Sequence, residues 1–364
     1  MEKIKILFII PSMAGGGAER VFSLLVKHIS RGEFEPSLAL LNKEGPFLAD
    51  VPGDVEMIDL KSPKSRYAFL KIIRLVRRLK PDIVCTTLGY LNLITLMAGI
   101  FFPNDTRIVI RESTHVSESL KLERYKRIFI RLYRRLYKRA HGIICLSESM
   151  KNDLLSHFTI PPDKITVIPN PVECEHVRQR LVERPALDFK ELDRNKTLIS
   201  IGRLEYEKGH DLLIEALSQL DRDVYLILVG SGTRQKKLEE LARRKGLGDK
   251  VIFAGFQQNP FAFTKYASLF VFPSRYEGFG SAIVEALACG LPVVTFAGPT
   301  AAREIIHPGF NGFLAEKIDP EHLTCAIEKA MKHCFQSDEI VRDAKSRFDI
   351  HEIISRYEVV FNNV

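Results

Sequence analysis

The sequence predicts an α/β protein with two doubly wound, Rossmann-like domains, each built on a parallel sheet. Its 364 residues exceed one ordinary core, so two domains of about 150–180 residues are expected. Short apolar runs alternate with helical patterns in both halves, as in parallel sheets covered by helices. The alternation stops once, in a polar and poorly periodic stretch. We therefore expect a domain over 1–172, a linker over 173–195 and a domain over 196–340, with a cleft between the domains at the carboxyl ends of their strands.

In the first half, each strand is a short run rich in Ile, Val and Leu, and each helix repeats apolar residues every three or four positions. The predicted strands lie at Ile4–Ile10, 35–41, 55–59, 83–85, 107–110, 142–146 and 165–168. The predicted helices lie at 18–30, 67–80, 88–102 and 120–139. The second helix ends before Pro81, which cannot continue a helix. The third is apolar over about 15 residues, short of the roughly 20 that cross a bilayer, and so predicts a buried helix.

The second half repeats this alternation of strands and helices. The predicted strands lie at 197–202, 225–230, 251–254, 269–272, 292–296 and 313–314. The predicted helices lie at 211–219, 234–245, 281–289, 321–333 and 349–361. Because each strand is followed by a helix or a long loop, the second half also predicts a parallel sheet.

Composition favours a globular protein without a membrane-spanning segment. Hydrophobic residues make up 46% of the chain and the mean hydropathy is −0.02, values typical of globular proteins. The six cysteines show neither a C-x-x-C pair nor metal-ligand spacing, which favours reduced thiols in the cytoplasm. The first apolar run passes into Gly15-Gly16-Gly17 without a cleavage site, so we expect no signal peptide.

Positive charge is concentrated in one predicted helix. The net charge is +8, and residues 120–139 alone hold nine Lys or Arg and one Glu, so the rest of the chain is close to neutral. The apolar residues of this helix follow a helical spacing, and the cations on its other faces are Arg124, Arg127, Arg131, Arg134, Arg135 and Lys138. A basic amphipathic helix is typical of membrane-surface binding, and a solvated basic surface is the alternative. Nucleic acid binding is disfavoured, because no aromatic stacking platform accompanies the charge.

Two glutamates eight residues apart, Glu277 and Glu285, flank a glycine–aromatic–glycine turn that opens a helix. Glu277 lies in the loop before the helix and Glu285 lies two turns along it, so both can reach one ligand. The unpaired N–H groups at the start of this helix favour an anion. A ligand with hydroxyls at one end and phosphates in the middle, such as a sugar nucleotide, suits this arrangement.

Other candidate residues follow predicted strands. Arg203 and Lys208 stand five residues apart after a strand and could clamp a diphosphate. Gly15-Gly16-Gly17 is either a ligand loop or a simple turn. It does not match the dinucleotide-binding motif G-x-G-x-x-G, and this mismatch disfavours a dehydrogenase. His115 follows a strand and could act as a general base or bind a hydroxyl, and a structural role is the alternative. The D-x-D at Asp221-Arg222-Asp223 precedes a strand, at the end of the sheet away from the cleft, and is interpreted as chance loop composition.

Taken in order, these motifs make the chain similar to the retaining glycosyltransferases of family 4, which have the two-domain GT-B fold. The resemblance covers essentially the whole length. Its further motifs are Ile168-Pro169-Asn170-Pro171, Val229-Gly230-Ser231-Gly232, Gly255-Phe256, Gly290-Leu291-Pro292-Val293-Val294 and Gly309-Phe310-Asn311-Gly312-Phe313. Each motif is weak alone, whereas their order and spacing make the resemblance specific.

The resemblance implies a role for each candidate residue. Arg203 and Lys208 would hold the donor diphosphate, Glu285 the ribose hydroxyls and Glu277 the donor sugar. The remaining donor contacts would come from Gly15, Gly16, Gly17, Phe256, Gly278, Phe279, Gly280 and Ser281. The resemblance implies no metal and no further cofactor, because cations and helix dipoles offset the charge. It also implies a final helix, within 341–364, that packs back on the first domain.

One segment departs from the commonest pattern of the family. Many relatives place a catalytic His directly after the strand that ends here at Ile110, in the position of Ser113. This chain instead reads Arg111-Glu112-Ser113-Thr114-His115, as a subset of relatives does. Glu112 and His115 are therefore both candidates for a catalytic role.

The resemblance implies a retaining enzyme that moves a hexose or N-acetylhexosamine from a nucleotide sugar, with UDP favoured over GDP, to a glycan acceptor. Relatives that extend undecaprenyl-diphosphate-linked glycans imply a role in lipid-linked oligosaccharide, O-antigen (lipopolysaccharide) or capsule assembly. The enzyme would be cytoplasmic and peripheral at the inner face of the cytoplasmic membrane, with the first domain and its basic helix binding the acceptor. The alternatives are a UDP-sugar 2-epimerase of the same fold and a noncatalytic scaffold that binds sugar nucleotides.

Overall fold

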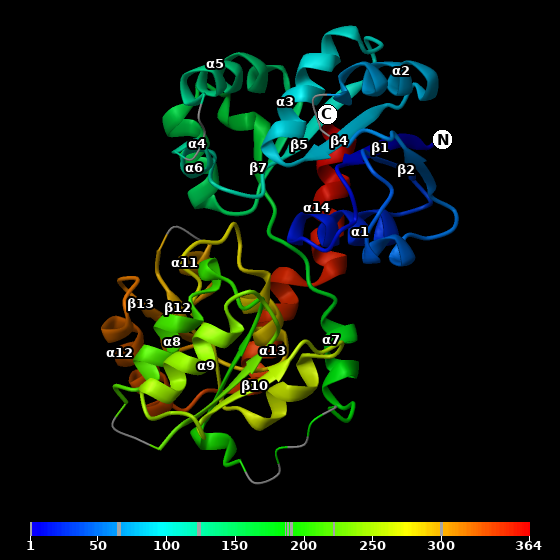
Figure 1. The fold of residues 1–364 in the computed structure, drawn as a ribbon. Coiled ribbons are helices and arrows are strands. Elements are labelled where there is room, and N and C mark those ends of the chain that lie inside the picture. The colour runs from blue at the N-terminus through cyan, green and yellow to red at the C-terminus, as the bar shows by residue number, and fades with distance from the viewer. Residues whose placement is uncertain are drawn as a thin grey trace. The chain divides into compact units, whose positions relative to one another are not determined.

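The computed structural model describes residues 2–63, 67–121, 125–185, 187, 189, 192–220, 223–298 and 301–364 (Figure 1). The chain forms two compact units. The first unit comprises Met1–Pro171 and Ile350–Val364, and the second comprises Val172–Asp349. The final helix therefore belongs to the first unit, although the second unit precedes it in the sequence.

The first unit is a seven-stranded parallel sheet in the order β3-β2-β1-β4-β5-β6-β7. Its strands are β1 Ile4–Ile10, β2 Phe34–Leu40, β3 Glu56–Asp59, β4 Ile83–Thr87, β5 Arg107–Arg111, β6 Gly142–Cys145 and β7 Ile165–Val167. Its α-helices are α1 Gly17–His28, α2 Phe69–Leu79, α3 Gly89–Ala98, α4 Val116–Lys121, α5 Lys126–Leu136, α6 Glu148–His157 and α14 Ile350–Asn363. Short 3₁₀ helices lie at Pro46–Asp50, Gly99–Phe101, Tyr137–Arg139 and Pro162–Lys164.

The second unit is a six-stranded parallel sheet in the order β10-β9-β8-β11-β12-β13. Its strands are β8 Thr197–Ile201, β9 Tyr225–Val229, β10 Val251–Gly255, β11 Leu269–Phe272, β12 Val293–Phe296 and β13 Gly312–Ala315. Its α-helices are α7 Cys174–Leu181, α8 His210–Leu217, α9 Gln235–Arg244, α10 Ser281–Ala288, α11 Ala302–Ile305, α12 Pro320–Lys332 and α13 Ser337–Phe348. Its 3₁₀ helices lie at Arg194–Lys196, Tyr206–Lys208 and Phe261–Tyr266.

Both sheets have the doubly wound strand order, which confirms the predicted fold class. In each unit the chain moves outward from the first strand and then returns to its other side with the fourth. The reversal lies between β1 and β4 in the first unit and between β8 and β11 in the second. In open parallel sheets, ligands bind at the carboxyl ends of the strands beside such a reversal. This edge of each sheet is therefore the place to look for the functional residues.

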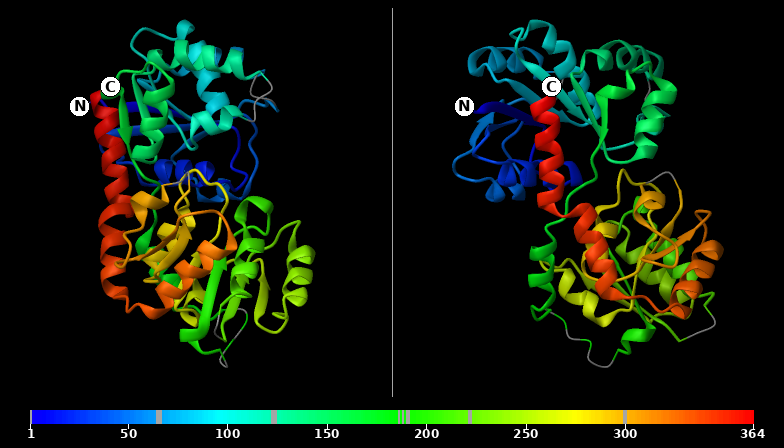
Figure 2. Two further views of the ribbon diagram at one scale, coloured as in Figure 1. Left: turned by 90° about the vertical axis from the view of Figure 1, so that its left-hand side faces the viewer. Right: turned by 180° about the vertical axis from the view of Figure 1, so that it is seen from behind.

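Helix α14 completes the core of the first unit. It packs against α1, and both helices contribute to the apolar cluster on the face of the sheet to which Phe8 points. The rings of Phe8 and Phe34 meet Phe361 edge to face, with centroids 6.1 and 6.2 Å apart, and Tyr357 is buried beside them. Figure 2 shows α14, in red, against the strands and helices of the first unit.

Three sequence-based assignments need correction. The predicted linker over 173–195 is part of the second unit, because its helix α7 buries Cys174 and Val177. The final helix within 341–364 joins the first unit only from Ile350, since α13 belongs to the second unit. Helix α6 was not predicted, because only three of its residues are buried and its apolar pattern is weak. Ser147 caps this helix by accepting a hydrogen bond from the Met150 amide at 3.2 Å.

The predicted helices over 88–102 and 120–139 are each interrupted. The apolar one ends as α3 at Ala98 and continues as a 3₁₀ turn. The basic one consists of α4, α5 and a 3₁₀ turn, and residues 122–124 between α4 and α5 lie outside the described residues. Within the described ranges, no helix is both long enough and apolar enough to cross a bilayer.

Candidate functional site

The loops after β8 and β11 bring Lys208 and Glu277 together in the second unit. Lys208 Nζ donates a hydrogen bond to Glu277 Oε1, although the residues are 69 positions apart. Only 19% of the Lys208 side chain and 20% of the Glu277 side chain are exposed. Because β8 and β11 flank the reversal of the strand order, this ion pair lies at the sheet edge where ligands bind in doubly wound folds.

Glycines allow these two loops to approach closely. Gly209, directly after Lys208, has a left-handed backbone with φ of +66°, and a Cβ there would collide with the carbonyl oxygen of Pro273. Gly280 has φ of +87° and caps the N-terminus of α10. Only glycine adopts such angles without strain, so both glycines are required by the backbone.

Helix α10 positions the predicted donor-binding turn. Gly278 and Gly280 are part of the turn, and Ser281 begins the helix. Phe279 is buried, and its ring meets that of Phe348 at 6.2 Å between centroids. Its side chain therefore anchors the turn to α13. Because the ring is buried, the Phe279 backbone and not its side chain is available to contact a ligand.

The second unit also contains the other side chains predicted to bind the donor, those of Glu285, Arg203 and Phe256. Glu285 lines a small pocket with Ile201, Thr264 and other residues of the second unit. Arg203 has 71% of its side chain exposed and pairs with Glu207 at 2.9 Å rather than with Glu277. Phe256 is 73% exposed and follows Gly255, whose φ is +69°. Arg203 would have to leave Glu207 to bind a diphosphate.

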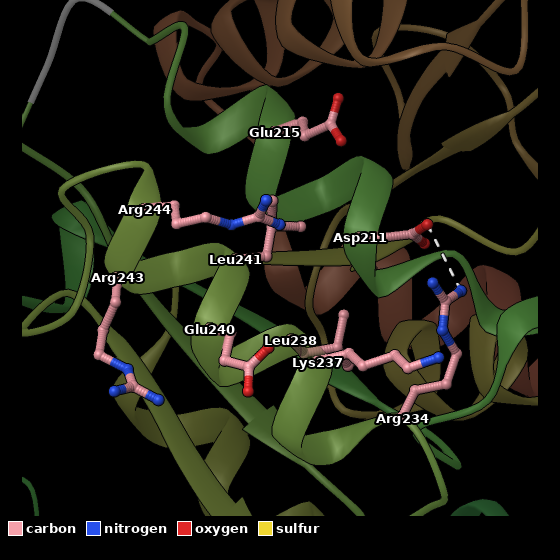
Figure 3. Close-up of a pocket in the computed structure, with 9 residues that line it drawn as sticks. All are labelled: Asp211, Glu215, Arg234, Lys237, Leu238, Glu240, Leu241, Arg243 and Arg244. Atoms are coloured by element: carbon pink, nitrogen blue, oxygen red, sulfur yellow. Dashed lines mark hydrogen bonds and ion pairs between the residues drawn. The ribbon is translucent and has the colours of Figure 1, made fainter.

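A second ion pair, not predicted from the sequence, lies beside the first. Asp211, in the first turn of α8, pairs with Arg275, two residues before Glu277. Asp211 and Arg234 also line a groove of about 650 Å³ between α8 and α9 (Figure 3). None of the predicted donor-binding residues lines this groove. Arg275 could have been selected from the sequence because it lies two residues before Glu277. Nothing in the sequence indicates that Asp211 is its partner.

The glycine loop before α1 lies in the first unit. Gly15 has φ of +109°, and Gly16 caps α1. A Cβ on Gly16 would collide with the carboxylate of Glu19, whereas Gly17 has open space around it. The loop follows β1, next to the reversal between β1 and β4, so it lies at the same edge of its sheet as Glu112.

Glu112 and His115 occupy different surroundings. Glu112 is only 2% exposed, and its Oε1 accepts hydrogen bonds from Asn92 Nδ2 at 2.8 Å and from the Tyr137 hydroxyl. Burial raises the pKa of the Glu112 carboxyl to about 7, against the opposing effect of these hydrogen bonds and of Arg111. His115 is half-buried and its Nε2 lies 3.3 Å from Ser149 Oγ.

Glu112 lines a cavity of about 330 Å³ within the first unit. The cavity walls come from the start of α3, from α4 and from α5, and include Leu93, Leu120, Phe129 and Tyr133. His115 does not line it, although Thr114 does. The cavity therefore combines apolar and aromatic walls with one buried carboxyl, and Glu112 faces it while His115 does not.

Among the described residues, the cations predicted on the basic helix are exposed. Arg127, Arg131, Arg134 and Arg135 lie on the outer side of α5, Lys138 follows in the 3₁₀ turn, and Tyr133 and Leu136 form the buried side. Arg124 lies outside the described residues. Helix α2 is a second basic helix, whose charge was not predicted to matter. Its exposed residues include Arg74, Arg77 and Arg78, and it contains no acidic residue. The net charge conceals the charge of α2, because the excess over 120–139 alone equals the total of +8 and the acidic residues elsewhere cancel the cations of α2.

Replacing Glu112 by Gln should change how stability depends on pH. The folded protein keeps this carboxyl protonated up to about pH 7, whereas the unfolded chain loses the proton near its ordinary pKa of 4.5. The folded state therefore holds more protons between these values, and stability falls by up to about 3 kcal/mol as the pH rises through them. Glutamine cannot ionise, so urea denaturation should show Glu112→Gln gaining stability relative to wild type between pH 5 and pH 8.

The matched control for this pH prediction is Glu118→Gln, on the exposed side of α4. Its stability should follow wild type at every pH. A difference between Glu112→Gln and wild type that stays constant from pH 5 to pH 8 would contradict the prediction.

Comparisons with known proteins identify the family of the chain. A family model described as glycosyltransferase family 4 matches residues 15–176, and one described as glycosyl transferases group 1 matches residues 184–347. An N-acetylgalactosamine-N,N′-diacetylbacillosaminyl-diphospho-undecaprenol 4-alpha-N-acetylgalactosaminyltransferase of Campylobacter jejuni is 30% identical over 358 residues, 95% of this chain and 94% of the relative. The amylovoran biosynthesis glycosyltransferase AmsD of Erwinia amylovora is 24% identical over 331 residues, 89% of each chain.

Solved structures show the same fold. HepE of Anabaena in complex with UDP has a TM-score of 0.80 at 23% identity, covering 99% of this chain and 100% of that one. WaaG, a glycosyltransferase involved in lipopolysaccharide biosynthesis, has a TM-score of 0.69 at 19% identity, covering 98% and 99%. A curated relative that matches almost the full length, and family models on both halves, establish that the chain belongs to the family 4 glycosyltransferases, with the GT-B fold.

Proposed function

We propose that the chain is a retaining glycosyltransferase that transfers a hexose or N-acetylhexosamine from a UDP-sugar to an undecaprenyl-diphosphate-linked glycan. The observation that carries this proposal is the Lys208–Glu277 ion pair at the carboxyl ends of β8 and β11. It combines a cation for a diphosphate with a carboxylate for sugar hydroxyls at one point. The UDP in the HepE structure and the lipid-linked acceptor in the name of the Campylobacter relative support the two substrates.

In this proposal the donor diphosphate binds between Lys208 and the N-terminus of α10. Lys208 offsets the charge that develops on the leaving UDP, and the N–H groups at the start of α10 donate to the phosphate oxygens. Arg203 also binds the diphosphate, after its ion pair with Glu207 breaks. Glu277 then accepts hydrogen bonds from the donor sugar, and Glu285 accepts them from the ribose. These cations and dipoles supply the charge stabilisation, so the proposed reaction needs no metal.

Retention follows if the acceptor hydroxyl attacks from the face that UDP leaves. The bond from the anomeric carbon to the phosphate oxygen breaks and the bond to the acceptor oxygen forms on the same side. The leaving phosphate takes the proton of the acceptor hydroxyl. The word alpha in the name of the Campylobacter relative supports this outcome, because the common UDP-hexoses are themselves α-linked.

The acceptor half of the proposal rests on the first unit. The cavity beside Glu112 has aromatic walls for the apolar face of a sugar and a carboxyl for its hydroxyls. The exposed cations of α5 suit the diphosphate of a lipid-linked acceptor or the anionic lipids around it. The enzyme would then act in cell-surface polysaccharide synthesis, as a peripheral protein at the inner face of the cytoplasmic membrane.

A triple substitution, Arg127→Ala with Arg131→Ala and Arg134→Ala, should weaken binding to vesicles of phosphatidylglycerol and phosphatidylcholine. Each cation near an anionic surface contributes about 1 kcal/mol, so losing three should lower the partition coefficient roughly 100-fold at low salt. Co-sedimentation measures this directly. The control replaces Arg243, Arg244 and Lys245, three exposed cations at the end of α9, and should leave vesicle binding unchanged. Loss of UDP binding in the α5 variant, or equal vesicle binding by both variants, would contradict the role of α5.

The proposed function is tested first with nucleotides and then with sugars. Thermal denaturation with UDP, GDP, ADP and NAD, all in the presence of EDTA, should show a stabilising shift with UDP. A ligand at about 100 times its Kd adds roughly 2.7 kcal/mol. UDP-sugars that bind are then incubated with a lipid-diphosphate glycan, and NMR of the product should show an α linkage. UDP-sugar consumption without acceptor would instead indicate a 2-epimerase, and binding without any turnover would indicate a scaffold.

A further inference from the structure

Asp211 and Arg275 tie the loop of Lys208 to the loop of Glu277. Arg275 Nη1 donates to Asp211 Oδ1 at 2.8 Å, and Nη2 donates to Asp211 Oδ2 at 2.8 Å. Such a two-bond fork between guanidinium and carboxylate fixes both distance and orientation. Only 15% of the Arg275 side chain and 18% of the Asp211 side chain are exposed, so water competes little for the pair.

Arg275 also holds the backbone next to Lys208. Its Nη1 donates to the Tyr206 carbonyl at 2.8 Å, and its amide donates to the Glu207 carbonyl at 2.8 Å. Its guanidinium lies over the Tyr206 ring, 4.2 Å from the centroid. Tyr206, Glu207 and Lys208 form one 3₁₀ turn. Arg275, two residues before Glu277, therefore fixes the turn that carries Lys208 through both its side chain and its backbone.

The sheet places β8 beside β11, but the pairing of the two strands ends before these loops begin. The paired part of the two strands is limited to Leu198 with Leu269 and Ile199 with Phe270. Lys208 and Glu277 lie beyond this paired part, so other contacts must hold them within hydrogen-bond distance. The Asp211–Arg275 fork is placed to do this, since it connects the first turn of α8 to the loop after β11.

Arg234 supports Asp211 from α9. Its Nη1 lies 3.4 Å from Asp211 Oδ2, and its guanidinium lies 5.2 Å from the centroid of the Tyr206 ring. Figure 3 shows the Arg234 side chain pointing to the Asp211 carboxylate. Burial alone would raise the pKa of Asp211, but hydrogen bonds and charge from Arg275, with the charge of Arg234, hold that pKa below its ordinary value.

We propose that Asp211 and Arg275 are positioning residues that set the spacing between Lys208 and Glu277 for the transfer reaction. This inference rests on the proposed function, because it assigns the fork a purpose in binding the donor. Neither residue touches the donor in this proposal. They act through the backbone of the Lys208 turn and the Glu277 loop. Their loss therefore lowers the rate of sugar transfer even though Lys208 and Glu277 themselves are unchanged.

The test compares Asp211→Ala, Arg275→Ala, Arg275→Lys and the double alanine variant in steady-state transfer assays. Each single alanine variant should lower kcat 10- to 100-fold, on the order expected when catalytic groups are misplaced, and raise the KM for the donor. The double variant should be no slower than the slower single variant, because both substitutions break one unit. Arg275→Lys keeps the charge but loses the fork, and should be intermediate.

The control is the Asp223–Lys250 ion pair, 2.8 Å long, in the same unit. Asp223→Ala with Lys250→Ala should leave kcat and KM unchanged. If the Asp211 and Arg275 variants lose only thermal stability and keep the kcat and KM of the wild type, the inference is overturned. Additive effects of the two single substitutions would also overturn it.

A second readout separates this inference from the proposed function. Hydrogen exchange should be faster in the variants at residues 203–209 and 274–280, with or without UDP. A wild-type protein that transfers no sugar, while its variants show this faster exchange, would refute the proposed function and leave the fork as the element that orders the two loops. Unchanged exchange at both segments would refute the fork itself.

Discussion

Lys208→Ala should lower kcat/KM for sugar transfer by about 100- to 1,000-fold, the effect of removing one preorganised charge-stabilising group from an active site. Lys208 Nζ donates to Glu277, and both side chains are largely buried. The substitution removes the cation proposed to face the diphosphate. It also leaves the Glu277 carboxylate without this partner, next to a ligand of the same charge.

The fall should appear in kcat as well as in KM. Charge on the leaving UDP grows in the transition state, so the lost interaction is stronger there than in the ground state. Initial rates at several concentrations of UDP-sugar separate the two parameters. Lys208→Arg should keep part of the activity that Lys208→Ala loses, since arginine retains the positive charge in a side chain of different shape.

Lys237→Ala, which removes an exposed cation from α9, is the control and should transfer sugar at the wild-type rate. The shift of the thermal midpoint with UDP should be much smaller in Lys208→Ala than in Lys237→Ala. A Lys208→Ala enzyme within a factor of three of wild type would contradict the role given to this ion pair.

Arg111→Met should lower the stability of the first unit by about 3 kcal/mol, which is within the range for breaking a buried polar network. Arg111 is completely buried. Its guanidinium donates to the side chains of Thr87, Asn170 and Tyr357. A buried polar atom left without its partner costs about 1–3 kcal/mol, and the substitution takes a donor from all three.

The effect should be largest where the chain leaves and re-enters the first unit. Asn170 precedes the unit boundary at Pro171, and Tyr357 lies on α14, which returns to the unit at Ile350. Arg111, on β5, thus hydrogen-bonds to both segments of the chain near the boundaries of the first unit. Thermal unfolding should show a midpoint lower by roughly 6–12 °C, since 1 kcal/mol shifts a domain of this size by about 2–4 °C.

Arg107→Met is the control, because Arg107 is exposed on the same strand; its midpoint should stay close to that of wild type. Tyr357→Phe should have a smaller effect than Arg111→Met, since it removes only the hydroxyl. Equal midpoints for Arg111→Met and Arg107→Met would show that the buried network contributes nothing to stability.

The sequence alone determined the fold class, because strands and helices have local signals. Apolar runs, periodic helices and the glycines of the turns are set by neighbours in the chain, and the strands were placed to within a few residues of their observed bounds. The family motifs were also readable, since each consists of residues a few positions apart. The same reasoning failed at α6 and α7, where few buried residues leave a weak pattern.

Only the tertiary structure decided which of these residues meet. Lys208 and Glu277 are neighbours because β8 lies beside β11 in the sheet, a pairing that no local pattern specifies. Asp211 and Arg275 meet for the same reason, 64 positions apart. The structure also separated Arg111 from Glu112: Arg111 is a buried tie to α14, whereas Glu112 faces a cavity. Burial and long-range contact depend on how the strands pack, and that information is spread over the whole chain.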